Sequence, residues 1–226
     1  MLADLLDLVL PGSCAGCGLT GPELCPGCRA DLARPPRLHT PTPRPAGLPR
    51  LATAASYDGA VRAVLLAHKE RGRLGLVRPL GLALAGAVRL LSDGPVVLIP
   101  VPSAPAVVRA RGHDHARRLA VRAAVELRRQ GVPARADCGL LPAREVVDQA
   151  GLTAGQRAAN LRGALVARRS MDGVRVVVVD DVVTTGATLV EAARALNAGG
   201  ALVQGAAVVA ATARRPHALS SHPAAA

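Results

Sequence analysis

The sequence predicts an α/β protein in which a mostly parallel sheet is flanked by helices, with a small four-cysteine module in front of it. Short apolar runs alternate with helical segments along most of the chain, half of the 226 residues are hydrophobic, and four cysteines cluster near the start. Strands separated by helices are typical of parallel sheets that are buried on both faces. The apolar content also excludes disorder over the whole chain.

The first ten residues read as a short amphipathic helix. They lack the basic segment with which a secretory signal begins. The most apolar stretches, 74–91 and 201–213, are either interrupted by Arg78 and Arg89 or too short to span a bilayer. We therefore expect a cytoplasmic protein without membrane insertion.

The cysteines form two CxxC pairs, Cys14 with Cys17 and Cys25 with Cys28, seven residues apart. Because disulfides are rare in proteins that are not exported, we expect four thiolates that hold a structural Zn²⁺. A redox CxxC is the alternative, although such pairs usually open a helix of a thioredoxin-like unit. Cys138 is predicted to be an inert core residue.

The chain divides into four predicted parts. The N-terminal helix and zinc module occupy 1–35, and a proline-rich linker that cannot form a helix or a central strand occupies 36–50. The α/β domain follows over 51–213, and residues 214–226 form a disordered tail.

The elements of the α/β domain follow from periodicity and from breaker residues. Helices are expected over 61–67, 76–91, 114–130, 153–162 and 187–197. Strands are expected over 96–102, 133–141, 174–180 and 201–211.

The charge and the aromatic content limit the partners. The formal net charge is +12, and Tyr57 is the only aromatic residue. The basic balance favours anionic partners, whereas base stacking on aromatic rings is excluded as a main mode of binding. Segment 109–129 carries seven arginines and two acidic residues, which suits phosphates but equally suits a solvated helix face.

The most informative segment follows the predicted strand of four valines at 176–179. Asp180 and Asp181 come at its carboxyl end, where open α/β sheets bind ligands, and Thr184–Thr188 lead into a helix. Gly186 permits a turn that directs N–H groups inward, and the helix start favours an anion. The pattern predicts a phosphate site beside a carboxylate pair; the alternative is two strand-end acids before an ordinary threonine-rich helix cap.

This segment resembles the PRPP-binding signature of type I phosphoribosyltransferases, and the chain as a whole resembles the ComF family of ComFC-like competence proteins. The resemblance covers nearly all of residues 10–211. It rests on the cysteine module, 57–62, His68-Lys69 with Gly72, 99–102, Arg111-Gly112, and Gln149 through 156–164.

The resemblance implies a fold, a ligand and site residues. The fold is that of the type I phosphoribosyltransferases, and the acid pair is catalytic and holds the ribose hydroxyls. PRPP binding is assigned to Asp180, Asp181, Thr184, Thr185, Gly186, Ala187 and Thr188. Pyrophosphate binding, with Mg²⁺, is assigned to Val101, Pro102, Ser103, Arg109, Arg111 and Lys69, although Lys69 could also be a solvated lysine.

The segment 141–163 is expected to be a mobile hairpin or a lid, with Gln149, Arg157 and Asn160 at polar positions of the family. For Arg157 and Asn160 an ordinary exposed helix face is an equal alternative. The chain departs from the family pattern RGFNQ, because His113, Asp114 and His115 replace its last three residues. A metal site at these three is a minor alternative, since their side chains diverge on a helix.

The sequence is compatible with three functions. The first is a phosphoribosyltransferase that acts on an unidentified base or amine. The second is a non-catalytic accessory protein that handles single-stranded DNA with competence-machinery proteins during DNA uptake. The third is a sensor of PRPP or nucleotides.

Overall fold

The computed structural model describes residues 12–103, 107–109, 112–144 and 154–212. The expected N-terminal helix, Arg111, Gln149 and the tail lie outside these residues, as does the side chain of Arg157. The helix expected from 153 is described only from Ala154.

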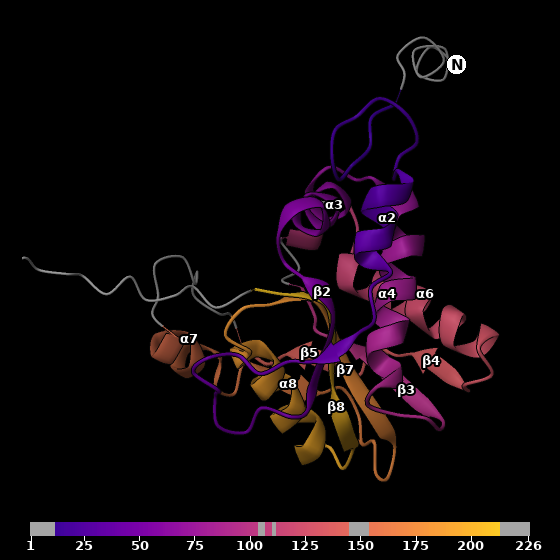
Figure 1. The fold of residues 1–226 in the computed structure, drawn as a ribbon. Helices are drawn as coiled ribbons and strands as arrows, with labels where there is room; N and C mark the ends of the chain where they lie inside the picture. The colour runs from indigo at the N-terminus through magenta and orange to yellow at the C-terminus, as the bar shows by residue number, and fades with distance from the viewer. Residues whose placement is uncertain (1–11, 104–106, 110–111, 145–153, 213–226) are drawn as a thin grey trace, which may run out of the picture.

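A six-stranded sheet forms the centre of the protein (Figure 1). Its order is β1-β2-β8-β7-β3-β4, and only β1 is antiparallel to its neighbour. This confirms the predicted mostly parallel sheet. The strands are β1 (Arg37–Leu38), β2 (Leu51–Ser56), β3 (Val96–Pro100), β4 (Ala134–Ala136), β7 (Arg175–Val183) and β8 (Leu202–Ala211).

Helices cover both faces of the sheet, and none of the described ones has the length and apolar character needed to cross a membrane. On one face lie α2 (Pro26–Leu32), α3 (Gly59–Glu70), α4 (Val77–Arg89) after a 3-10 turn at Leu74–Leu76, and α6 (His115–Arg129). On the other lie α7 (Ala154–Leu161) and α8 (Ala187–Ala198).

The four valines of β7 explain why this strand is central. Val177 and Val179 belong to the buried cluster under α3, α4 and α6, whereas Val176 and Val178 belong to the cluster under α8. Successive side chains of a strand point to opposite faces, so a strand covered on both sides must be apolar throughout.

The prediction of one continuous strand over 133–141 is wrong, because the structure has two short strands there with a break between them. The chain pairs with β3 as β4, and the Asp137 N–H still donates to the Leu98 carbonyl at 3.0 Å. It then leaves the sheet and forms a separate antiparallel hairpin of β5 (Leu140–Pro142) and β6 (Leu165–Ala167). Cys138 lies in this link, half-buried rather than inside a strand.

The cysteine module packs directly onto the α/β domain. Cys14 and Cys28 are buried in the same apolar cluster as the residues of α3 and α4. A Cβ atom on Gly16 would lie 2.6 Å from Cys28 Sγ and 3.2 Å from Ala60 Cβ of α3. The Arg73 guanidinium also donates to the Ser13 carbonyl at 2.8 Å. The module and the domain therefore share one core.

Substitution by alanine should have opposite effects on stability at two glycines of α4. A Cβ on Gly81 would lie 2.6 Å from Arg122 Cβ and 3.3 Å from Ala123 N, so Gly81→Ala forces α4 and α6 apart. We expect it to lower the free energy of unfolding by about 1–3 kcal/mol. Gly86 meets only Pro36, at 3.6 Å, so Gly86→Ala should raise stability by about 0.5–1 kcal/mol. Urea unfolding of both variants tests this, and equal effects would contradict the close helix crossing.

Candidate functional site

The acid pair lies at the carboxyl end of β7, beside the end of β3. Pro100 is the register partner of Val179, and the Val101 N–H donates to the Val179 carbonyl at 2.9 Å. The loop predicted to receive pyrophosphate, Val101–Ser103, therefore begins directly next to Asp180. Parallel pairing places the two predicted ligand segments together at one edge of the sheet.

Asp181 is the charged centre of this edge. Its Oδ2 accepts a hydrogen bond from Lys69 Nζ at 2.8 Å and lies 3.3 Å from His115 Nε2. Burial alone would raise the pKa of Asp181, but His115 and Lys69 outweigh it and hold the pKa well below its usual range. The carboxylate is therefore ionised at neutral pH, and it joins α3 and α6 to β7.

Asp180 behaves in the opposite way. Burial and the adjacent charge of Asp181 raise the pKa of Asp180 well above its usual range. The Asp181 N–H donates to Asp180 Oδ1 at 2.8 Å, and the Val182 N–H donates to Asp181 Oδ1 at 2.8 Å. The pair thus offers one carboxyl group that favours its proton and one carboxylate.

The three residues that depart from the family pattern, His113, Asp114 and His115, have different surroundings in the structure. Asp114 caps the start of α6, where its Oδ1 accepts from the Arg117 N–H at 3.0 Å. The His113 ring lies 6.0 Å from the ring of the buried His68. Only His115 reaches the acids: its ligand atom and those of Asp180 and Asp181 lie within 4.8 Å of one another, close enough to share a cation.

The loop after the acids starts α8 at a left-handed residue. Gly186 is the N-cap of α8 and has a φ of 81°. Residues that carry a Cβ atom rarely adopt this left-handed conformation. A Cβ there would also lie 3.0 Å from Leu48 Cδ1, so the linker segment packs closely against the loop. Thr185 Oγ1 accepts from the Ala187 N–H at 3.4 Å. The first-turn N–H groups of α8 then point out of the helix, as anion binding requires.

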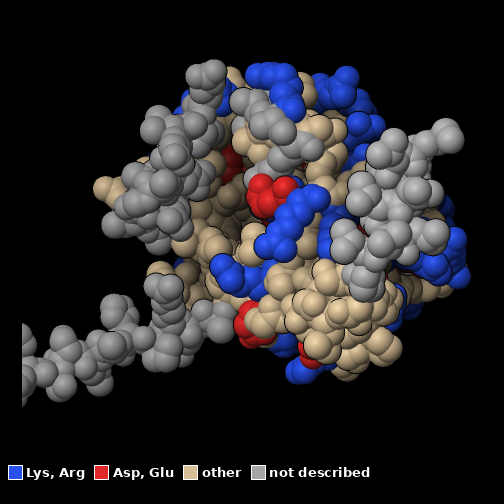
Figure 2. Space-filling model, turned by 90° about the horizontal axis from the view of Figure 1, so that it is seen from above, with Lys and Arg blue, Asp and Glu red and all other residues tan. Residues whose placement is uncertain are grey.

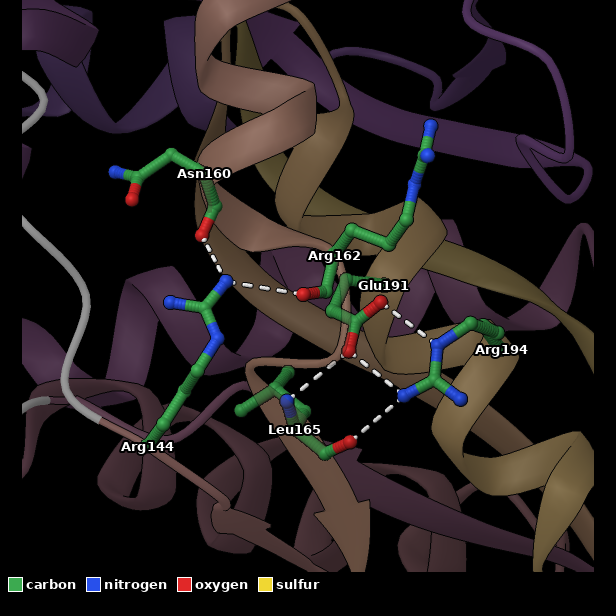
Figure 3. Close-up of polar contacts among 6 residues, drawn as sticks. All are labelled: Arg144, Asn160, Arg162, Leu165, Glu191 and Arg194. Carbon is green, nitrogen blue, oxygen red and sulfur yellow. Dashed lines mark hydrogen bonds and ion pairs between the residues drawn. The ribbon is translucent and has the colours of Figure 1, made fainter.

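The end of the predicted lid is fastened through its backbone. The Arg144 guanidinium donates to the Asn160 carbonyl at 2.6 Å and to the Arg162 carbonyl at 3.0 Å, where α7 ends (Figure 3). The structure thus gives the Asn160 carbonyl a positional role, whereas the predicted role of its side chain stays a prediction.

A second clamp holds the hairpin to α8. The buried Glu191 carboxylate accepts from the Leu165 N–H at 3.0 Å and from Arg194 Nε at 2.8 Å (Figure 3). Arg194 also donates to the Leu165 carbonyl at 2.9 Å. Burial would raise the pKa of Glu191, but Arg194 and the backbone donor lower it. The sequence pattern does not indicate a role for Glu191 and Arg194, because Glu191 binds the backbone of Leu165, which lies 26 residues away in the chain.

Basic side chains are frequent on the face of the protein that Figure 2 shows. Seen from above, Lys and Arg side chains spread over this face and border the hollow near its centre, whereas acidic side chains form small patches (Figure 2). Arg109 is exposed, and Pro102 and Ser103 are half-buried. No contact brings Arg109 to the acid pair within the described residues, so its predicted role stays a prediction.

The four cysteines fit a zinc ion. Their sulfur atoms lie within 4.8 Å of one another, and Cys17 Sγ is 3.8 Å from Cys25 Sγ. A tetrahedron with Zn–S bonds of about 2.3 Å has edges of about 3.8 Å. Burial would raise the pKa of the Cys14 thiol, but backbone N–H groups, among them that of Cys25 at 3.3 Å, lower it to about 6, whereas burial and the neighbouring thiols raise the pKa of Cys28. The cluster could therefore bind a structural zinc.

Comparison with known protein families agrees with this geometry. Residues 115–223 match the family model described as a phosphoribosyl transferase domain, and no curated protein matches the chain. The matched part begins at the first residue of α6 and includes β7, the acid pair, the loop and α8. Together with the sheet, the match confirms the predicted fold class and supports the type I phosphoribosyltransferase superfamily.

The two acids should affect stability with opposite signs. Asp180→Asn removes a carboxylate whose pKa is raised in the folded state, so it should stabilise the protein at pH 7, and the gain should fade as pH falls through that pKa. Asp181→Asn leaves Lys69 and His115 without their carboxylate and should cost about 3 kcal/mol. The stability that Asp181 contributes is present above its unfolded pKa of about 3.9 and is lost below it.

Thermal unfolding of both variants between pH 7 and pH 4 checks these signs. Asp93→Asn, at an exposed position before β3, is the control for the same acid-to-amide change away from the site. A lower melting temperature of Asp180→Asn at pH 7 would contradict the assignment of the raised pKa.

Zinc content tests the cysteine cluster. We expect one zinc per chain, and we expect Cys14→Ser to lose it, whereas Cys138→Ser should retain it. Because Cys14 and Cys28 lie in the shared core, chelation should lower the melting temperature of the whole chain. Metal-free protein with an unchanged melting temperature would argue against a structural zinc.

Proposed function

We propose that this protein binds PRPP and transfers its phosphoribosyl group to a base or amine, with release of pyrophosphate. The observation that supports this most directly is the continuous run of acid pair, left-handed Gly186 and α8 at the carboxyl end of the central strand. It offers a diol site and a phosphate site in the order in which a 5-phosphoribosyl group presents them.

The two acids are suited to the ribose hydroxyls. The two carboxyl groups lie side by side and can each bind one hydroxyl, and the raised pKa of Asp180 favours the form that can also donate a hydrogen bond. The 5-phosphate would lie against Thr184–Thr188, where hydroxyls, backbone N–H groups and the helix dipole favour an anion.

The pyrophosphate end would lie toward Val101–Ser103, with Lys69 and Arg109 as cationic contacts. Oxygen ligands are those that Mg²⁺ prefers, so the acid pair fits a metal that accompanies PRPP and would neutralise part of the pyrophosphate charge. Lys69 can leave Asp181 when ligand and metal bind, and its ammonium group is then available to a phosphate oxygen.

The reaction needs little covalent chemistry from the protein. The nitrogen of the acceptor forms a bond to C1′ as the C1′–O bond breaks, pyrophosphate leaves with the bonding electrons, and the nitrogen releases its proton to solvent. The side chains of this edge hold the ribose, exclude water and stabilise the charge on the departing group. The identity of the acceptor would be set outside the residues assigned here.

A second candidate function is handling of single-stranded DNA during natural transformation, with proteins of the competence machinery. It is supported by the ComF resemblance and by exposed arginines of α6, namely Arg117, Arg118, Arg128 and Arg129. Such a surface binds phosphates with an affinity that falls as salt rises. A third candidate is a PRPP sensor, in which the same site binds but does not turn over its ligand.

Titration calorimetry with PRPP and Mg²⁺ tests the proposal. We expect saturable binding by the wild type and a loss of at least about 100-fold in the double variant Asp180→Asn, Asp181→Asn, because two hydrogen bonds to charged or buried groups disappear. Asp93→Asn, an exposed acid before β3 at the opposite edge of the sheet, should bind as the wild type does.

The same experiment separates the candidates. PRPP binding with pyrophosphate release in the presence of bases favours the transferase, and binding without release favours the sensor. Salt-sensitive binding of a short single-stranded DNA, with no PRPP binding, would overturn the transferase proposal.

A further inference from the structure

A cavity of about 600 Å³ lies beside the phosphate loop. Its walls are the linker segment 42–47, the two ends of α7, and one side of α8 from Ala187 to Asn197. A volume of this size is typical of sites for small molecules, which are mostly apolar with a few polar groups.

The cavity shares three residues with the predicted phosphate loop. Thr184, Thr185 and Ala187 belong to its wall, whereas Asp180 and Asp181 do not. The residues that would hold ribose are thus outside the cavity, and the residues that would hold its phosphate are at its border. From there the cavity extends along α8 to Asn197, away from the acids.

The far part of the cavity has the chemistry of a nucleotide site. Pro43, Pro45, Val190 and Ala193 provide apolar surface on which a flat ring can pack. Arg162 adds a positive charge. In the described part of the chain its guanidinium has no hydrogen bond or ion pair, and its side chain points away from the Glu191–Arg194 pair (Figure 3).

The backbone of Arg162 is held in place by a hydrogen bond, although its guanidinium has no partner among the described residues. Its carbonyl is held by Arg144 at 3.0 Å, and the chain turns at Gly163 with φ of 70°. The other arginine of the wall, Arg194, is neutralised by Glu191. Arg162 is therefore the net positive charge among the described residues of the wall, and it suits a second phosphate group.

We propose that this cavity binds the second half of a ligand in which the phosphate at the loop is part of a diphosphate that carries a nucleoside. The terminal ribose lies at the acid pair and its 5-phosphate at Thr184–Thr188. The second phosphate contacts Arg162, and the nucleoside lies along α8. This inference rests on the proposed function, because the loop must first hold a 5-phosphoribosyl group.

Calorimetry with ribose 5-phosphate and ADP-ribose as probes tests the inference on the full chain. We expect ADP-ribose to bind at least about tenfold more tightly than ribose 5-phosphate, because it adds the contacts of the cavity. Arg162→Ala should reduce this preference about tenfold through loss of a charged hydrogen bond. Ala46→Trp, at an exposed position of the wall, should reduce it by filling the cavity.

Arg89→Ala is the matched control, since Arg89 is an exposed arginine at the end of α4 and is not part of the cavity wall. The double variant Asp180→Asn, Asp181→Asn should lose both probes, because they share the ribose site. Binding of ribose 5-phosphate with no preference for ADP-ribose, or a preference that both cavity variants leave unchanged, overturns the inference alone. Failure of ribose 5-phosphate to bind at all overturns the proposed function and this inference together.

Discussion

The buried carboxylate of Asp181 is the constraint on which the site depends. An ionised group in the interior must be paired, and Asp181 takes its partners from two different helices, Lys69 of α3 and His115 of α6. These contacts fix both helices against the carboxyl end of β7, and the charge that they hold on Asp181 helps to raise the pKa of Asp180. The asymmetry of the pair, which suits a diol, is therefore a consequence of packing rather than of the two aspartates themselves.

Much of the fold could be predicted because several of its elements carry their own signal. The valines at 176–179 are apolar on both faces and can only be a central strand, and Asp114 is a strong cap before the helix of 115–129. The strand Leu51–Ser56 was not predicted, because its short Ala-rich sequence becomes a strand only through pairing with β8. The strand expected over 133–141 failed for a related reason, since Leu140 pairs with Ala167, 27 residues later, and the Gly139 carbonyl accepts from the Arg168 N–H, 29 residues later.

The candidate site, like the fold, has parts that could be predicted from the sequence and parts that could not. Its chain-local parts, the acid pair, the threonine loop and the cysteine spacing, were visible in the sequence, and the structure brings each of them into a compact arrangement. The contacts between distant segments were not visible. Lys69 was expected at pyrophosphate but lies on a carboxylate 112 residues away, and His115 was considered with His113 and Asp114 but joins the acids instead. Such pairings depend on how helices cross, which a single sequence does not encode locally.

The contacts of Glu191 and Arg194 with Leu165 change what this edge of the hairpin offers to another chain. Both the N–H and the carbonyl of Leu165 are engaged by side chains of α8, so this position of β6 presents no free peptide unit. An exposed hairpin edge is otherwise a template on which another chain can add a strand and begin to aggregate. At this position two charged side chains of a neighbouring helix take the place of a strand partner, and they leave neither hydrogen-bonding group of Leu165 available to a strand of another chain.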